Sequence, residues 1–154
     1  MEAVLTSNKE KNYASLIHLS AMTKYFIPFG NYILPIILWG SKKDSSKFID
    51  YSGKQVMNFQ LSMLLYSILL LVISIPTLLF SIFSNVSFNE IENDNFLIEK
   101  LSTGNITGIV VIALVAVGLF CLMKIAEFFL IIYGAIKTSE GEYFKYPLTI
   151  NFLK

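Results

Sequence analysis

Five polar side chains with possible chemical roles lie in or beside apolar stretches of this chain. They are His18, Asn58, Gln60, Lys124 and Glu127. Ionisable groups inside a membrane are costly and often mark a transport path or a pairing. Lys124 and Glu127 are three residues apart, so they can pair along one helix face. Two interpretations stay open: a polar lining for a substrate path, or hydrogen-bonded packing beside a self-neutralising pair.

The chain lacks the residues of a catalytic or metal centre. His18 is the only histidine and Cys121 the only cysteine. A lone histidine without a second ligand at helical spacing makes a poor metal site, and Cys121 has no base near it in the sequence. A nucleophile elbow, a phosphate loop and paired carboxylates in an apolar stretch are also missing. We therefore expect no enzyme, no metal and no cofactor.

Small polar residues recur every seven positions between residues 60 and 81, at Gln60, Ser67, Ser74 and Ser81. This repeat is compatible with a polar groove. Stripes of small polar residues more often mark surfaces where helices approach closely in lipid. The interpretation we favour for Ser67, Ser74 and Ser81 is therefore a helix-packing stripe.

The composition predicts an integral membrane protein. Hydrophobic residues make up 55% of the 154 residues, charged residues 15%, and the mean hydropathy is +0.62. A soluble domain usually has about 25% charged residues, so too few are present to coat a globule. The net charge of +1 provides no field to attract nucleic acid. The expected partners are the lipid bilayer and other membrane proteins.

Two apolar stretches are long enough to cross a bilayer. Leu61 to Phe83 is free of charge over about 35 Å of helix, against roughly 30 Å of hydrocarbon, and Pro76 is expected to bend it. Ile106 to Met123 is also uncharged, and the apolar character resumes at Phe128. A single helix from 106 to 136 would be about 46 Å long, and would have to tilt or project from the membrane.

The first apolar stretch, residues 14–41, is interrupted by Pro28, Gly30 and Asn31. Gly and Asn tolerate left-handed backbone and Pro ends a preceding helix, so these residues predict a turn. One alternative is a single kinked crossing. The other is a helical hairpin with arms of about 24 Å and 14 Å, too short to cross a bilayer comfortably.

Lysine placement favours the hairpin. Lysine-rich loops face the cytoplasm, which places the loop after the first stretch and the carboxyl tail inside. A single crossing would then leave seven lysines inside and three outside, whereas a hairpin gives nine and one. Aromatic residues expected to anchor the chain at the membrane surface are Trp39 and the tyrosines Tyr13, Tyr25, Tyr32, Tyr133, Tyr143 and Tyr146.

The predicted protein is all-α, with four helices: a short hairpin broken at Pro28–Asn31 and two full crossings. Both termini are expected in the cytoplasm. The expected segments are a polar amino-terminal segment 1–13, the hairpin 14–41, an interfacial segment 44–60, a crossing 61–84, an acidic external loop 85–105, a crossing 106–137 and a cytoplasmic tail 138–154.

Several motifs resemble those of a known family. They are Leu16–Ala21, Tyr25–Asn31, Pro35–Trp39 with Lys42–Asp44, Gly53–Gln60 and Gly141–Leu148. Together they resemble a bacterial family of small membrane proteins without an agreed activity, related to the import component of the chloroplast inner envelope, the twenty-kilodalton Tic subunit. The chain departs from that pattern at Tyr51-Ser52, where an acid or His is common, and at Lys145, where Arg is usual.

The resemblance implies a four-helix fold in the bacterial cytoplasmic (inner) membrane. It also implies a role in protein transport or membrane assembly, although a shared fold does not by itself transfer a role. The alternative is an accessory structural subunit that packs against a larger membrane complex. Self-association remains open in either case.

Overall fold

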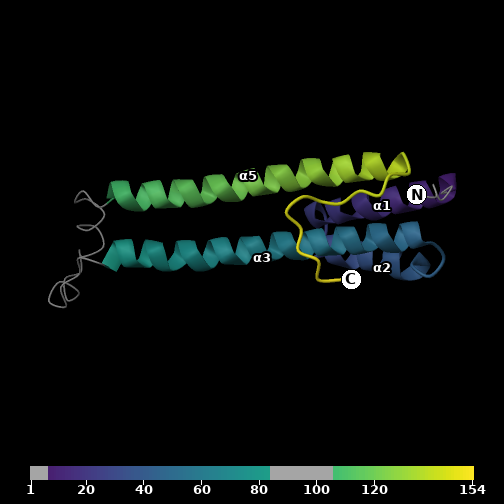
Figure 1. Ribbon diagram of the computed structural model, residues 1–154. Helices are drawn as coiled ribbons and strands as arrows, with labels where there is room; N and C mark the ends of the chain where they lie inside the picture. The colour runs from purple at the N-terminus through teal and green to yellow at the C-terminus, as the bar shows by residue number, and fades with distance from the viewer. Residues whose placement is uncertain (1–6, 84–105) are drawn as a thin grey trace. The chain divides into compact units, whose positions relative to one another are not determined.

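The computed structural model describes residues 7–83 and 106–154, and the regular structure in these ranges is helical. The elements are α1 Asn8–Ser20, the 3-10 helix η1 Ala21–Tyr25, α2 Gly30–Lys42, α3 Lys47–Phe83 and α5 Ile106–Ser139 (Figure 1). The prediction of an all-α protein with a short hairpin and two long helices is confirmed. The predicted external loop 85–105 lies outside the described residues.

Two helices are long and apolar enough to cross a membrane, over Lys47–Phe80 and Val110–Ser139. Only 6% of the most apolar window of each is buried within the protein, so their side chains are available to lipid. α3 has 37 residues and α5 has 34, or about 55 Å and 51 Å of helix. α5 continues unbroken through Lys124 and Glu127, and both helices are longer than the roughly 30 Å of hydrocarbon.

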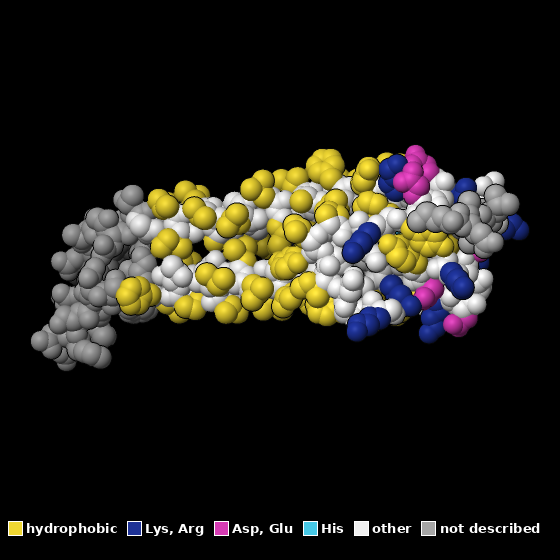
Figure 2. Space-filling model, in the orientation of Figure 1, with side chains coloured by type: hydrophobic (Ala, Val, Ile, Leu, Met, Phe, Trp, Pro, Cys, Tyr) yellow, Lys and Arg dark blue, Asp and Glu magenta, His cyan; other side chains and the backbone are white. Residues whose placement is uncertain are grey.

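The chain divides into two compact units. The first, here named the terminal unit, consists of Met1–Leu65 and Ile125–Lys154, and the second, the apolar unit, is Tyr66–Lys124. Figure 2 shows hydrophobic side chains over both helices of the apolar unit, while the acidic and basic side chains on this face gather on the terminal unit. The buried apolar side chains of the terminal unit include Ala14, Ile17, Phe48, Val56, Phe59, Ile131 and Ala135.

Helix α1 begins with a capping box. The Glu10 amide donates to Ser7 Oγ at 3.3 Å, and the Ser7 amide donates to Glu10 Oε2 at 2.8 Å. These two bonds satisfy donors that the first turn leaves free. The helix therefore starts at Asn8, within the segment 1–13 that was predicted only to be polar.

The hairpin turn differs in detail from the sequence prediction. The left-handed residue is Phe29, with φ 60°, while Gly30 and Asn31 already belong to the first turn of α2. Gly30 lies so close to η1 that a side chain would not fit: a Cβ at this position would lie 2.8 Å from Thr23 O. The glycine therefore lets the two arms approach each other, and the reversal itself falls on a phenylalanine.

The arms of the hairpin and the first turns of α3 are joined by polar contacts. Tyr13 Oη donates to Leu38 O at 2.8 Å, which ties α1 to α2. Trp39 Nε1 donates to Asp50 Oδ1 at 2.9 Å, which ties α2 to α3. A Cβ on Gly53 would collide with the Trp39 ring, so this glycine allows α2 to lie close against α3.

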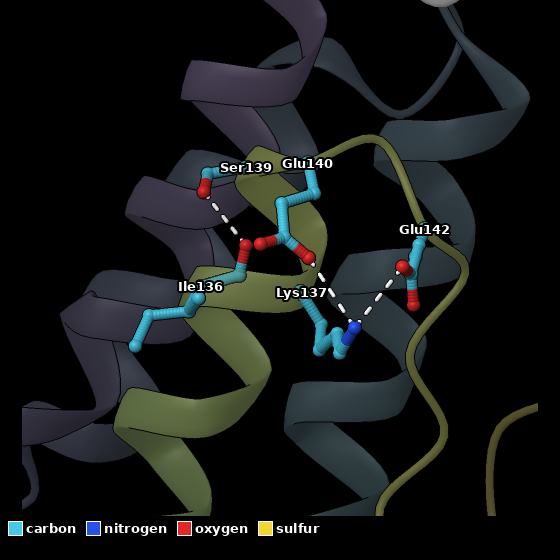
Figure 3. Close-up of polar contacts among 5 residues, drawn as sticks. All are labelled: Ile136, Lys137, Ser139, Glu140 and Glu142. Atoms are coloured by element: carbon cyan, nitrogen blue, oxygen red, sulfur yellow. Dashed lines mark hydrogen bonds and ion pairs between the residues drawn. The ribbon is translucent and has the colours of Figure 1, made fainter.

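The end of α5 is a Schellman motif. The Glu142 amide donates to Lys137 O at 3.1 Å and the Gly141 amide to Thr138 O at 3.0 Å, with Gly141 at φ 93°. This pairing of the last carbonyls with amides beyond a left-handed glycine ends a helix. In Figure 3 the Lys137 ammonium lies between Glu140 and Glu142, at 3.3 Å and 3.1 Å from their carboxylates. The chain then returns along the terminal unit as the segment 142–154.

Candidate functional site

The terminal unit contains a buried ion pair. Lys24 Nζ in η1 lies 2.5 Å from Glu127 Oε1 in α5, and only 1% of the Glu127 side chain and 16% of the Lys24 side chain are exposed. A buried charge is tolerated only when it is paired. Glu127 therefore holds the tip of the hairpin against α5 through Lys24, a pairing that the spacing of charges along the sequence did not predict.

A signal for Lys24 was present in the sequence. It is the only charged residue between Lys11 and Lys42, and so the only charge inside the first apolar stretch. A charge in such a stretch points to a buried partner. The pairing with Glu127 joins residues more than a hundred positions apart, which no local spacing indicates.

His18 is fully buried and bonded through both ring nitrogens. Nδ1 lies 2.7 Å from Tyr146 Oη and Nε2 lies 3.1 Å from Thr138 Oγ1. Burial lowers the pKa of His18 to about 3, so the ring is neutral near pH 7. A neutral imidazole has one donor and one acceptor nitrogen, and the two hydroxyl groups can match either tautomer.

Tyr146 is part of the core, and its predicted role as a membrane-surface anchor is wrong. Only 1% of it is exposed, its ring stacks on Phe59 with centroids 4.1 Å apart, and its hydroxyl reaches His18. Burial raises the pKa of Tyr146, and the negative charge of Glu127 adds to the rise. The phenol keeps its proton and fixes the carboxyl-terminal segment to α1 and α3.

Asn58 and Ser62 hold the last residues of the chain against α3. Asn58 Nδ2 donates to Leu153 O at 3.0 Å, and the Leu153 amide donates to Asn58 Oδ1 at 2.8 Å. The Ile150 amide donates to Ser62 Oγ at 2.9 Å. The Asn58 side chain thus pairs with both the amide and the carbonyl of Leu153. This holds the carboxyl-terminal segment, which has no regular secondary structure, in place against α3.

Gln60 joins α3 to the start of α2. Its Oε1 accepts from Asn31 Nδ2 at 2.7 Å, and both side chains are buried. Gln60 Nε2 is buried and forms no hydrogen bond to any residue that the structure describes. Asn31, predicted only as a turn residue, therefore has a second task in packing the hairpin against α3.

The predicted cluster is only partly brought together. His18, Asn58, Gln60 and Glu127 are all buried in the terminal unit, each with its own partner from another element. Lys124 belongs to the apolar unit, where its Nζ lies 5.3 Å from the centroid of the Phe120 ring. Each of the four buried residues joins two elements of the terminal unit. Whether they also line a substrate path stays a prediction.

The serine stripe lies on α3. Ser67 and Ser74 are half-buried in the apolar unit, whereas their neighbours Ile68 and Ile75 are exposed. The helix-packing role of the stripe stays a prediction. The side chain of Ser81 lies outside the described residues.

The chemistry available at these positions is hydrogen bonding and charge pairing. Within 7–83 and 106–154, no group of three His, Cys, Asp or Glu residues is placed to hold a metal ion. Cys121 is exposed in the apolar unit.

Comparison with protein families matches residues 9–153 to the MamF/MmsF family, described as the magnetosome magnetite crystal formation protein family. The chain belongs to the MamF/MmsF family. The matched range contains every motif that suggested a family of small bacterial membrane proteins, and that part of the prediction is confirmed. No curated protein and no solved structure matches the chain.

Membership of the MamF/MmsF family agrees with the architecture described above. The matched range contains both long apolar helices, as well as the hairpin and the carboxyl-terminal segment. The matched range also contains the buried polar contacts made by Lys24, His18, Asn58 and Gln60. The family match therefore covers the folded terminal unit and is not limited to a membrane-crossing segment.

Proposed function

We propose that this protein is a non-catalytic structural component of a bacterial membrane-assembly system, acting by packing against lipid and other membrane proteins. The observation that supports this most is how the terminal unit uses its polar side chains. His18, Gln60 and Glu127 are each bonded to another side chain of the same unit. They fix helices in place, and the exposed apolar surfaces of α3 and α5 are what the protein offers to its surroundings.

The proposed location is the cytoplasmic (inner) membrane, with both termini and the turn at residues 43–46 in the cytoplasm. The support is the lysine distribution: Lys42, Lys43 and Lys47 lie in or beside that turn, whereas Glu90, Glu92, Asp94 and Glu99 lie in the segment expected outside. Translocating lysines beside a membrane segment is costly, and acids contribute little.

A role in the insertion or export of client proteins is the more specific form of this proposal. It rests on the resemblance of the motifs to the family related to the envelope import component, a kinship that stays a prediction. The test is deletion followed by quantitative proteomics of membranes and culture medium, with the wild-type gene restored as the control. Loss of a defined set of clients supports the role, and unchanged membranes and medium contradict it.

A second candidate function is participation in magnetite crystal formation, which the family match over residues 9–153 favours. The test is expression of this chain in a magnetotactic bacterium from which its own family members have been deleted. Restored crystal number and size in electron micrographs would support the function. Unchanged defective crystals, with the protein present in the membrane at normal abundance, would contradict it.

Co-purification in mild detergent tests the alternative that the protein is an accessory subunit. Recovery at fixed stoichiometry with one large membrane complex supports that alternative. Recovery as a self-assembled oligomer counts against it. Because this experiment reports partners and not activity, its outcome is independent of the deletion test.

A further inference from the structure

The tip of the hairpin is an exposed apolar surface. Phe26 is 86% exposed, Ile27 58% and Phe29 73%. The stretch from Tyr25 to Ser41 carries no charged residue. In water this surface would be unfavourable at about 25 cal/mol per Å² of apolar area, so it fits an apolar environment.

The backbone of this tip is satisfied from within. The amides of Phe26 and Ile27 both donate to Thr23 O, at 3.0 Å and 2.8 Å, and the Gly30 amide donates to Ile27 O at 3.0 Å. Pro28 has no amide proton to place. Non-helical backbone in lipid is unfavourable because its polar groups lack partners, and this turn avoids most of that cost.

The side-chain hydroxyls of the same arm are also turned inward. Thr23 Oγ1 donates to Ser20 O and Ser20 Oγ donates to Ile17 O, each at 2.6 Å. Lys24, the charged residue of the arm, is paired with Glu127. The tip therefore exposes hydrocarbon and keeps its polar atoms within the terminal unit.

The opposite end of the hairpin has the reverse character. The turn between α2 and α3 exposes Lys43, Asp44 and Ser45. Lys42 Nζ lies 4.5 Å from the centroid of the Tyr13 ring, and Lys43 Nζ lies 5.9 Å from that of Trp39. Lysines beside Trp and Tyr are typical of the boundary between lipid and water. The hairpin thus has one end suited to that boundary and one suited to hydrocarbon.

The position of the tip along α3 gives the direction of insertion. Asn31, just after the tip, bonds to Gln60, and Gln60 lies in the part of α3, Gln55 to Phe83, that carries no charged residue. From Gly30 to Trp39, α2 covers about 15 Å, roughly half of the 30 Å hydrocarbon core. A hairpin of that reach enters one leaflet and returns.

We propose that the loop 26–29 inserts among the acyl chains of a single leaflet, as a wedge that turns back without crossing the bilayer. The partner is the hydrocarbon of the leaflet on the side of the 43–46 turn. This inference goes beyond the proposed function, because it concerns how the hairpin meets lipid whatever system the protein serves. The added volume lies in one leaflet only, which bends the membrane.

The test places a fluorophore on single cysteines in the full chain, with Cys121→Ser removing the native thiol. The positions are Phe26→Cys at the tip and Ser45→Cys as the control at the polar turn, both exposed side chains. After reconstitution into phosphatidylcholine and phosphatidylglycerol vesicles, brominated acyl chains should quench the Phe26 probe severalfold more than the Ser45 probe. Aqueous iodide should show the opposite order.

Iodide quenching of the Phe26 probe as strong as that of the Ser45 probe would overturn the proposal. Emission of Trp39, the only tryptophan, checks that each variant retains the fold of the terminal unit. A deletion strain without a phenotype would contradict the proposed function and leave this result untouched.

Bending is tested with the double variant Phe26→Asp, Ile27→Asp, compared with Ser45→Asp. At high protein-to-lipid ratio, wild type and Ser45→Asp should give smaller vesicles or tubules in electron micrographs, whereas the double variant should not. Equal vesicle sizes for all three proteins would overturn the wedge action.

Discussion

The terminal unit and the apolar unit are built from parts of the same two long helices, yet they are held together differently. In the terminal unit, α3 and α5 bury Gln60, Asn58 and Glu127 against residues from other elements. In the apolar unit, the same helices expose most of their side chains. In lipid there is no hydrophobic drive for helices to associate, so hydrogen bonds and ion pairs such as those of the terminal unit are needed to fix one helix against another.

The contrast also predicts which unit responds to substitution. Removing one partner of a buried polar contact lowers the free energy of unfolding strongly, because the other partner stays buried and loses that interaction. Side chains that face lipid tolerate replacement by other apolar groups. Trp39 lies in the terminal unit, so its emission reports unfolding of that unit in mild detergent.

The largest expected effect is at the buried ion pair. Lys24→Met removes the ammonium that pairs with the buried Glu127 carboxylate and should lower the free energy of unfolding by about 3–5 kcal/mol. Lys24→Met combined with Glu127→Met should recover most of the loss, since no charge remains buried. The control is Lys137→Met, whose exposed pairs should leave the unfolding midpoint unchanged. Equal midpoints for Lys24→Met and Lys137→Met would contradict the buried pairing.

The next largest effect is a dependence of the free energy of unfolding on pH, caused by His18. Burial lowers its pKa from 6.5 to about 3, so between these values the unfolded chain binds a proton that the folded chain does not. Stability is therefore full above pH 6.5 and is lost as the pH falls toward 3, by at most about 1.4 kcal/mol per pH unit. Between pH 7.5 and pH 5 the loss should be about 2 kcal/mol.

The measurement for His18 is the unfolding midpoint at both pH values in wild type and in His18→Gln. Glutamine keeps a donor and an acceptor for Tyr146 and Thr138 but does not titrate. The variant should lose much less stability on acidification. An identical loss in both proteins would assign the pH dependence to another group.

Two glycines on α5 make a matched comparison between the units. A Cβ on Gly134 would lie 2.9 Å from His18 Nδ1 and from the Phe144 ring, whereas nothing lies within 4 Å of a Cβ on Gly118. Gly134→Ala should cost about 1–3 kcal/mol by overpacking, and Gly118→Ala should be neutral or slightly stabilising. The measurement is the unfolding midpoint of each variant. Equal midpoints for the two variants would contradict the difference in packing between the units.

The smallest effect concerns two serines on α3. Ser62→Ala removes the acceptor for the Ile150 amide and should cost about 1 kcal/mol. Ser74→Ala keeps a small side chain at a half-buried position and should cost less. Proteolysis near the carboxyl terminus offers a second measurement, and cleavage should accelerate in Ser62→Ala only. Acceleration in both variants would count against a specific role of the Ser62–Ile150 hydrogen bond.

The elements were predictable from the sequence because each leaves a local signal. Uncharged runs located both long helices, and Pro28 with Gly30 located the hairpin turn. The left-handed residue was misjudged, since the conformational freedom of Gly30 is used for close approach to Thr23 and the reversal falls on Phe29.

The partners were not predictable, because they depend on how distant segments align. Lys24 with Glu127, and His18 with Tyr146, join residues more than a hundred positions apart. Tyrosines at the surface and in the core also look alike in a sequence, so Tyr146 was misassigned. His18, Asn58, Gln60 and Glu127 stood out in the sequence as polar residues in or beside apolar stretches. Which residue each of them contacts could be seen only in the structure.

The most direct test of the account is the side of the membrane on which each segment lies. Single cysteines at Ser7, Ser45, Asn95 and Ser139, in a Cys121→Ser background, are exposed to an impermeant thiol reagent on intact cells. Only the cysteine at Asn95 should react on intact cells, and all four should react once the cells are opened. Labelling at Ser7 on intact cells would mean that the first apolar stretch crosses the membrane, which would contradict the hairpin that returns to its own side.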